Sequence, residues 1–570
     1  MPQGRRKAPF SGKAKKQQMQ AKKNRQNPLV IRHEKNDDDS EENDDFSCNE
    51  SSKIQKINKQ PRDNTGKNRY ALQFFQESKK ELQERKEDAR KTITPISLQE
   101  QEVSDNYFPS GIDMPKRPPW DVNMSKEHLE MKEQRYFTEY LKNMEELGKI
   151  SYFELNLETW RQLWRVLEKS DILLMIVDIR YPVLMFPPYL YNYITEILRK
   201  DMILVLNKID LAPPALVVAW HEYFKSQYPK LRILFFTSFP TYNIRGNTED
   251  GAGLKQRRRK GKLRMAAEGA QKLLETCKEI VGDKVDLTSW QEKINEEMNL
   301  EYDLDDLNHK DNVIIEKEDT GYFHHEKYKN GVVTIGCIGT PNVGKSSFMN
   351  AVMGKKVVSV SRTPGHTKHF QTIFLTKTVC LCDCPGLVFP STVPKQLQIL
   401  MGSFPIAQVR EPYTTIKYLG ERLDLPTLLR IQHQDNDDTW SAIDICDGWA
   451  AKRNYMTART ARLDTYRAAN SLLRMTLEGK ICLFIYPVGW TSNKVKWENH
   501  SDVEMIKWIQ ASNHRNATVH HQNETQSDDE ESKASEESPA ENSEEEEEDT
   551  NDDAGPSMIT SNKFNLLDAD

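Results

Sequence analysis

A lysine and a serine that follow two spaced glycines have the clearest chemical potential in this chain. Residues 339–346, GTPNVGKS, fit the pattern G-x-x-x-x-G-K-[ST], and an apolar run, 332–338, precedes them. Glycines let backbone N–H groups close around phosphate oxygens, and the N-terminus of a following helix adds its positive dipole. Lys345 would reach the outer phosphates, and the Ser346 hydroxyl would hold Mg²⁺. The alternative is an ordinary turn whose glycines, lysine and serine match the pattern by chance. The apolar segment before the pattern and the helix-compatible segment after it favour a phosphate-binding loop instead.

A second polar run, Asn207-Lys208-Ile209-Asp210, follows the apolar residues 202–206. Guanine presents two adjacent N–H donors, and the Asp210 carboxylate can accept both of them. Adenine would leave that carboxylate buried and unpaired, at a cost on the order of several kcal/mol. Asn207 can reach the other edge of the base, and the Lys208 stem can cover its face. The alternative is a strand-end turn, and the phosphate-loop pattern in the same chain favours guanine binding. A weaker signal is Ser238, whose backbone N–H could donate to guanine O6.

Two segments after the phosphate loop are suited to respond to the γ-phosphate. Thr367, in the turn RTPGHT, can supply a second hydroxyl to Mg²⁺. The runs 371–376 and 379–382 are predicted to pair as a hairpin that ends at Asp383. Asp383 can bind Mg²⁺ through water, and the Gly386 N–H can sense the γ-phosphate. The predicted catalytic set is therefore Lys345, Thr367, Asp383 and Gly386, and no general base is identifiable.

The order of these motifs is unusual, because the guanine motif precedes the phosphate loop by more than one hundred residues. The same sheet can form if the domain is circularly permuted, since neighbours in a sheet need not be neighbours in sequence. We expect an α/β fold of the P-loop, Rossmann-like type. Its buried parallel strands are predicted at 172–177, 202–206, 231–236 and 332–338, and its helices at 159–170, the later part of 182–199, 213–227 and 265–280. Polar residues 178–180 follow the first strand, at the end where open α/β sheets bind ligands.

Charge is separated along the chain, although its formal net charge is only −6. Residues 1–26 hold nine Lys or Arg and no acid, whereas 528–553 are mostly Asp, Glu and Ser. Such blocks repel themselves and cannot bury a core, so both ends are expected to be disordered. The expected domains are a basic then acidic arm at 1–66, a charged helical segment at 67–150 (with helices at 67–104 and 124–149), a permuted nucleotide domain at 151–393 with an irregular acidic insert near 284–329, a mainly helical domain at 394–510, and an acidic tail at 511–570.

Several features leave more than one interpretation open. For the basic arm, RNA contact or nuclear targeting is favoured over a solvated tail without function. For the basic cluster 255–264, RNA contact and a solvated loop are equally compatible with the sequence. The arginines of the helix predicted at 457–478 also fit either an RNA contact or a solvated face; they are Arg459, Arg462, Arg467 and Arg474. The sequence has no secretory signal or 18-residue apolar run, so free thiols in a reducing compartment are expected. Cys380, Cys382 and Cys384 alternate as on a strand, which is favoured over a metal site.

The motifs NKID, GTPNVGKSS, TPGHT and DCPG, in this order, resemble the circularly permuted GTPases of the YlqF/YawG group. The resemblance implies motif order G4-G5-G1-G2-G3, GTP and Mg²⁺ as ligands, and a role in ribosome biogenesis. It implies that Asn207, Lys208 and Asp210 read the base, that Thr367 belongs to switch I, and that residues 383–386 form switch II. The loop residues implied to hold nucleotide are Gly339, Asn342, Val343, Gly344, Lys345, Ser346 and Ser347. Ile179 departs from the family's usual D-A-R.

The same resemblance bears on the rate of hydrolysis. Leu387 stands where many GTPases have a water-orienting glutamine, and leucine has no hydrogen-bonding group. Asn342 occupies the position that in similar proteins helps to bind an activating K⁺. We therefore expect a slow GTPase that K⁺ or a ribosomal partner stimulates.

Three functions are compatible with these residues. The first is a GTP-hydrolysing switch on a ribosomal precursor particle or its RNA, in the cytoplasm and nucleus, with the nucleolus as a further candidate. The second is a non-hydrolysing adaptor that binds RNA or proteins and uses guanine nucleotide as a structural ligand. The third is an ATPase, which Asp210 disfavours. A monomer without membrane contact is expected, with protein partners for the acidic tail.

Overall fold

The computed structural model describes fourteen stretches of the chain, which contain all the elements discussed below. They are 54–57, 72–75, 78–103, 106–121, 124–148, 150–238, 253–254, 267–299, 315–316, 326–354, 357–358, 370–435, 437–457 and 462–511. All of these described residues belong to one compact unit. The basic arm at 1–26, the basic cluster 255–264, Thr367 and the acidic run 528–553 lie outside the described residues.

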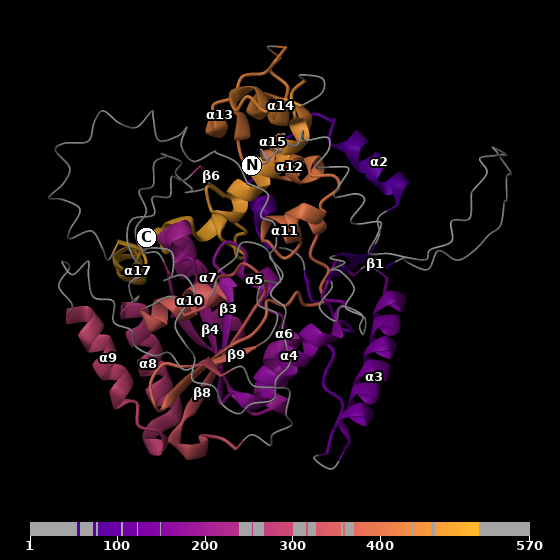
Figure 1. Ribbon diagram of the computed structural model, residues 1–570. Helices are drawn as coiled ribbons and strands as arrows, with labels where there is room; N and C mark the ends of the chain where they lie inside the picture. The colour runs from indigo at the N-terminus through magenta and orange to yellow at the C-terminus, as the bar shows by residue number, and fades with distance from the viewer. Residues whose placement is uncertain are drawn as a thin grey trace, which may run out of the picture. The chain divides into compact units, whose positions relative to one another are not determined.

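A seven-stranded sheet organises the nucleotide domain (Figure 1). Its strands are, in spatial order, β5 (Arg232–Phe235), β4 (Asp201–Asn207), β3 (Ile172–Asp178), β8 (Val333–Ile338), β10 (Val379–Asp383), β9 (Gln371–Phe374) and β7 (Ile315–Glu316). The first five are parallel, β9 is antiparallel to β10, and β7 is antiparallel to β9. The predicted α/β sheet and switch hairpin are confirmed.

The central pairing of this sheet is the physical form of the permutation. Strand β3 lies between β4, with Asp178 opposite Asn207, and β8, with Met175 opposite Ile338. Every residue of β3 is buried, which matches the apolar run 172–177 that precedes Asp178, because a parallel strand covered on both faces needs no polar side. The strand that precedes the phosphate loop therefore sits beside a strand from much earlier in the chain.

Helices pack on this sheet close to where the sequence predicts them. They are α4 (Leu157–Lys169), α5 (Pro182–Met185), α6 (Pro188–Asn192) with a π-helical turn at Tyr193–Ile197, α7 (Pro214–Gln227), α8 (Ala267–Val281) and α10 (Lys345–Met353). Helix α4 begins at the N-cap Asn156 and buries Trp160, Leu163 and Trp164. It contacts β8, while α8 contacts β5 and α10 contacts β10.

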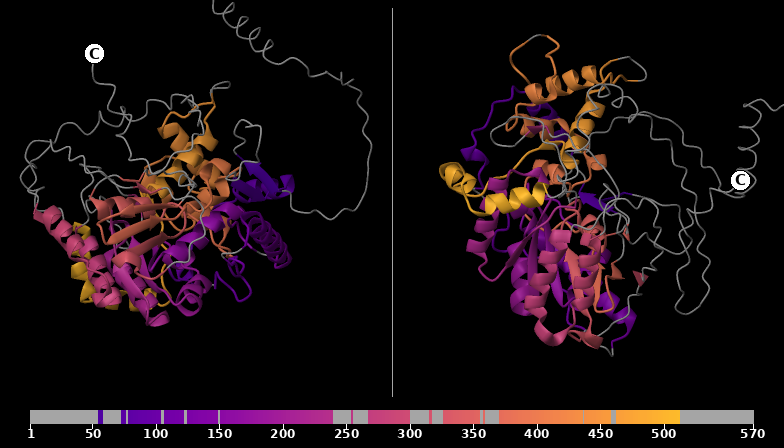
Figure 2. Two further views of the ribbon diagram at one scale, coloured as in Figure 1. Left: turned by 60° about the horizontal axis from the view of Figure 1, so that its bottom comes forward. Right: turned by 90° about the vertical axis from the view of Figure 1, so that its left-hand side faces the viewer.

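The segment after residue 393 is mainly helical, as expected. Its helices are α11 (Lys395–Leu400), α12 (Tyr413–Gly420), α13 (Leu425–Leu429), α14 (Ala442–Lys452), α15 (Thr465–Leu477), α16 (Lys494–Glu498) and α17 (Asp502–Ala511). Helices α11, α12, α14 and α15 contact one another and are grouped in all three views (Figures 1 and 2). Helix α17 packs on α7, and β11 (Ile481–Cys482) pairs with β6 (Gly253–Leu254). The boundary predicted after residue 393 stays a prediction.

The predicted helix over 457–478 begins later than expected. Helix α15 starts at Thr465 with Asp464 as its N-cap. Before it, Met456 and Leu463 form an antiparallel bridge, and Arg462 O accepts from the Thr457 N–H. This pairing satisfies the backbone groups of Thr457 and Arg462, so the helix need not begin at Thr457.

The helical expectation for 67–104 is largely wrong, whereas α3 (Lys126–Glu146) confirms the helix expected at 124–149. Only α2 (Lys79–Asp88) is a longer helix among the described residues of the earlier range. Strand β2 (Leu72–Phe75) pairs with β1 (Ile54–Ile57), which lies in the arm expected to be disordered. Further on, the Ile93, Ile96 and Val103 N–H groups donate to carbonyls of the C-terminal segment. Tertiary pairing outweighs helix propensity here.

The acidic insert near 284–329 is also more ordered than expected. It contains α9 (Thr288–Asn299) and the edge strand β7. Helix α9 packs against α8 and buries Trp290 and Ile294, four residues apart on one helical face (Figure 1). The many acids obscured this narrow apolar stripe in the sequence.

Membrane spans and metal-binding clusters are two features that the described residues do not contain. No described helix is long and apolar enough to cross a membrane. Within the same residues, no group of three or more His, Cys, Asp or Glu is gathered to hold a metal ion. Cys380 and Cys382 lie buried in β10 and Cys384 just after it, all as free thiols, in agreement with strand alternation.

Candidate functional site

The phosphate loop connects β8 to α10 through two glycines that no other residue can replace without strain. Gly339 has φ +148° and Gly344 has φ +99°, both in the region that favours glycine. A Cβ on Gly339 would come within 2.4 Å of the Ile176 carbonyl oxygen, and one on Gly344 within 2.6 Å of Asn207 Nδ2. The loop is thus pressed against β3 on one side and the predicted guanine motif on the other.

Lys345 opens helix α10 and folds back across this loop. Its Nζ donates to the carbonyls of Gly339 at 2.9 Å and Thr340 at 2.8 Å. Burial lowers the pKa of Lys345, and the charge of Asp383 opposes that effect. The ammonium is held inside the arc of the loop, where a phosphate oxygen would replace lost hydration.

Ser346 and Asp383 meet beneath the loop, although thirty-seven positions separate them. The Ser346 hydroxyl donates to Asp383 Oδ2 at 3.2 Å. Burial raises the pKa of Asp383 to about 6, against the lowering influence of Lys345 and Ser346. Its Oδ1 is buried and has no hydrogen-bond partner among the described residues. A hydroxyl beside an unsatisfied carboxylate oxygen is a hard oxygen donor set, which fits Mg²⁺. Ser347, the next residue of α10, is half-buried.

The predicted guanine motif is tied directly to the phosphate loop. Asn207 Nδ2 donates to the Val343 carbonyl at 2.8 Å, and Lys208 Nζ donates to the Asn342 carbonyl at 2.6 Å. Lys208 has a left-handed φ of 60°, which turns the chain sharply after β4. Two motifs that are more than one hundred residues apart in sequence therefore form a single edge of the sheet, as a permuted GTP site requires.

Two further residues belong to the side of the site that is predicted to bind the base. The buried carboxylate of Asp210 accepts from Thr237 Oγ1 at 2.7 Å, which fixes its orientation. Ser238 follows Thr237, and its Oγ is buried with no hydrogen-bond partner within the described residues. The proposed donation from its backbone N–H to guanine stays a prediction.

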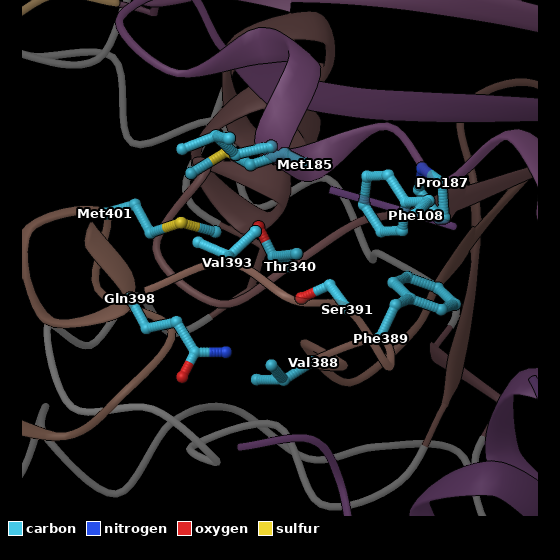
Figure 3. Close-up of a pocket in the computed structure, with 11 residues that line it drawn as sticks. Phe108, Met185, Pro187, Thr340, Val388, Phe389, Ser391, Val393, Gln398 and Met401 are labelled. Atoms are coloured by element: carbon cyan, nitrogen blue, oxygen red, sulfur yellow. The ribbon is translucent and has the colours of Figure 1, made fainter. Parts of the chain in front are cut away.

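The segment predicted to be switch II packs closely on the phosphate loop. The Leu387 N–H donates to the Gly339 carbonyl at 3.3 Å, and its side chain is buried. A Cβ on Gly386 would lie 2.8 Å from Pro341 Cα and 3.2 Å from Lys345 Nζ. Behind the loop, Thr340 lines a small cavity with Met185, Val388 and Gln398, and Figure 3 shows these side chains converging on it. A displacement of residues 386–389 would therefore change both the contacts with the phosphate loop and the cavity behind it.

Two groups near the site did not enter the sequence-based set of site residues. Asp178 and Arg180, at the end of β3, form a buried pair with Lys208 beside them. Burial alone would raise the pKa of Asp178, but the charges of Arg180 and Lys208 hold it well below its usual range. The second is the backbone carbonyl of Gly402, which accepts a hydrogen bond from Asn342 Nδ2 at 3.0 Å. The run of polar residues after an apolar strand was a signal for the first group, whereas no local signal marks Gly402.

Comparison with known proteins agrees with this geometry. The family described as "50S ribosome-binding GTPase" matches residues 334–414. "Guanine nucleotide-binding protein-like 1" of Mus musculus is 47% identical, over 87% of this chain and 88% of that protein. The Homo sapiens protein of the same name is 45% identical, over 89% of each chain. This chain belongs to the guanine nucleotide-binding protein-like 1 family of circularly permuted GTPases.

The matched family model and a more distant relative are both described as GTPases, and this chain is accordingly a GTPase. A more distant relative, "Large subunit GTPase 1" of Schizosaccharomyces pombe (strain 972 / ATCC 24843), is 33% identical over 66% of this chain and 58% of that protein. Two solved YlqF structures are also similar. The GDP-bound one is 16% identical over 58% of this chain and 98% of its own, with TM-score 0.32. The GNP-bound one from T. maritima is 17% identical over 57% and 97%, with TM-score 0.33.

Proposed function

We propose that this GTPase is a nucleotide-dependent switch that acts on a precursor of the large ribosomal subunit or its RNA. The observation that carries the proposal is the junction of the two motifs, in which Asn207 and Lys208 donate to the backbone of the loop that ends at Lys345. The names of the matched family and of the Schizosaccharomyces pombe relative, which mention the 50S ribosome and the large subunit, support the choice of particle.

In this proposal each part of the site has one role in hydrolysis. Lys345 and the loop N–H groups stabilise the charge that develops on the transferred phosphoryl group. Ser346 and Thr367, and Asp383 through water, would hold Mg²⁺, which would supply positive charge beside the phosphates. The Gly386 N–H would contact the γ-phosphate and lose that contact after hydrolysis, which frees switch II.

Intrinsic turnover is proposed to be slow. Leu387 is buried and has no group that orients water. Asn342 has its amide nitrogen committed to the Gly402 carbonyl, which directs the amide oxygen away from Gly402. A K⁺ ion bound by that oxygen, or a contact from the particle, would supply the missing stabilisation.

Charged regions outside the described residues are assigned to partners. The basic arm 1–26 would contact RNA and assist nuclear entry, and the acidic run 528–553 would contact basic proteins. The protein would act as a monomer, away from membranes, in the cytoplasm and nucleus, with the nucleolus as a further candidate location.

Sedimentation and crosslinking of the tagged protein test the particle. The expected result is co-migration with large-subunit precursors in the presence of a non-hydrolysable GTP analogue and release with GDP. Sedimentation as free protein in both states would overturn the ribosomal role. Phosphate release, compared with Lys345→Ala and Asp383→Ala, separates the switch from the adaptor. Equal release by all three proteins, with and without particles, would refute the GTP-hydrolysing switch.

A further inference from the structure

A buried charged cluster occupies the carboxyl end of β3, which is the direct neighbour of β8, the strand that precedes the phosphate loop. The side chains of Asp178 and Arg180 are each 1% exposed. Arg180 approaches the carboxylate with two nitrogens, Nε at 3.0 Å from Oδ1 and Nη2 at 2.8 Å from Oδ2. Lys208 Nζ donates to the same Oδ2 at 2.8 Å. One carboxylate thus serves two cations.

Each cation also reaches a different part of the molecule. Lys208 Nζ continues to the Asn342 carbonyl of the phosphate loop at 2.6 Å. Arg180 Nη1 donates to the Thr476 carbonyl at 2.7 Å, in the last turn of α15. The cluster is therefore continuous from the phosphate loop, through the predicted base-reading loop, to a helix of the C-terminal segment.

Stability alone does not require this arrangement. A buried ion pair can often be replaced by apolar side chains of similar volume without loss of stability. What charges and directed hydrogen bonds provide is a defined position for each partner, and Arg180, with its rigid fork, can hold a carboxylate and a carbonyl at once. The positive charge also lies at the C-terminal end of α15, where the helix dipole is negative.

The C-terminal segment touches the same two loops at other points. The Gly402 carbonyl accepts from Asn342 of the phosphate loop. Gln510 Nε2 donates to the Ile209 carbonyl at 2.7 Å and to the Ala212 carbonyl at 3.0 Å, next to the base-reading motif. A Cβ on Gly479, just after α15, would come within 2.8 Å of Leu211. These contacts leave little room for the loops and the segment to move independently.

We propose that Arg180 is a positioning residue for guanine-nucleotide binding, which it serves by holding Asp178 and, through it, Lys208. Because the same guanidinium grips the end of α15, nucleotide binding and the ordering of that helix end are coupled in both directions. The inference rests on the GTP binding of the family and is independent of the ribosomal role.

Nucleotide affinity of purified full-length protein gives the first test, with Arg180→Met against a matched control. Arg161→Met removes another largely buried arginine, which pairs with Glu133 at 2.7 Å and Glu158 at 3.2 Å, and neither carboxylate belongs to the nucleotide loops. Coupled sites typically change each other's affinity by roughly 5- to 150-fold. We expect GDP, followed with a fluorescent analogue, to bind at least about 5-fold more weakly to Arg180→Met and unchanged to Arg161→Met.

Hydrogen exchange gives a readout that a purely structural role would not move. The N–H groups of Glu478, Gly479 and Lys480 donate to the carbonyls of Arg474, Thr476 and Met475 at the end of α15. In the wild type and Arg161→Met, GDP should slow their exchange, and in Arg180→Met it should not. Arg180→Lys keeps the charge near Asp178 but lacks the fork. It should therefore keep most of the GDP affinity and lose the exchange response.

The outcomes are decisive even if Arg180→Met folds poorly, because Arg180→Lys then carries the test. Wild-type affinity in Arg180→Met, or a full GDP response at 478–480 in either Arg180 variant, would overturn the coupling. Failure of the wild type to bind GDP at all would instead refute the nucleotide site, and failure to sediment with particles would refute only the ribosomal role.

Discussion

Substitution of Gly386 by alanine tests whether switch II must touch the phosphate loop during hydrolysis. An alanine Cβ would lie 2.8 Å from Pro341 Cα, 3.0 Å from Pro341 N and 3.2 Å from Lys345 Nζ. Ordinary contacts begin near 3.4 Å, so switch II must retreat from the loop by at least 0.6 Å, the difference between 3.4 and 2.8 Å. Gly386 has no left-handed φ, and alanine therefore adds this contact without backbone strain.

The size of the effect follows from the displacement. A misplacement of about 1 Å in a catalytic arrangement can lower a rate about 100-fold, so a shift of this size should lower kcat by roughly 10- to 100-fold. That loss corresponds to about 1.4 to 2.7 kcal/mol in the activation barrier. GDP has no γ-phosphate for the Gly386 N–H to contact, so its affinity should change by less than about threefold.

Single-turnover phosphate release and binding of a fluorescent GDP analogue measure the two quantities separately. Gly420→Ala, at the end of α12, is the matched control. Its Cβ would lie 2.7 Å from Ile93 Cδ1, which is the movable end of a side chain and lies outside the phosphate loop. This control should keep both properties. Wild-type turnover in Gly386→Ala, or a loss of GDP affinity as large as the loss of rate, would refute the assigned role of switch II.

Three further predictions concern other parts of the chain. Burial raises the pKa of Glu154 from 4.5 to about 7, because the folded protein favours the neutral carboxyl group. The contribution of Glu154 to the free energy of unfolding is therefore fully present below pH 4.5 and is lost as the pH rises through 7. Glu154→Gln should therefore be more stable than the wild type at pH 8 by about 3 kcal/mol, with no difference near pH 4, in urea unfolding against pH; parallel curves would contradict it. Gly402→Ala, at φ +79° with its Cβ 2.8 Å from Asn342 Nδ2, should abolish K⁺ stimulation and any K⁺ dependence of GDP affinity, unlike Gly489→Ala at φ +76°. Asp210→Asn replaces one carboxylate oxygen by a donor NH₂ group, so in competition binding GDP should bind roughly 100-fold more weakly and a xanthosine nucleotide more tightly. An unchanged preference for guanosine over xanthosine nucleotides would remove Asp210 from base recognition.

Local sequence was sufficient for the parts of this protein whose chemistry is local. The phosphate loop and the guanine motif each combine a short apolar strand with groups a few residues apart, so their ligands could be predicted from residue types and spacing. Strands β3, β4 and β8 and helix α4 were predictable for the same reason, because a buried parallel strand is a continuous apolar run, whereas an amphipathic helix repeats its apolar residues about every 3.6 positions.

Other features depend on contacts between distant segments. The extended path near Ile93 and Val103 arises from hydrogen bonds to the C-terminal segment, which override the helical tendency of its residues. Strand β7 exists because the edge of the sheet offers unpaired backbone groups to an otherwise polar insert. Periodicity within a window of residues contains no information about such partners.

Sequence by itself determined which groups could meet a guanine nucleotide, because the glycines, Lys345 and Asp210 act through their own geometry and charge. Only the tertiary structure decided that β3 lies between β4 and β8 and that Arg180 joins Asp178 to the end of α15. The physical reason is that sheet order and buried ion pairing are set by packing among segments that lie up to three hundred residues apart.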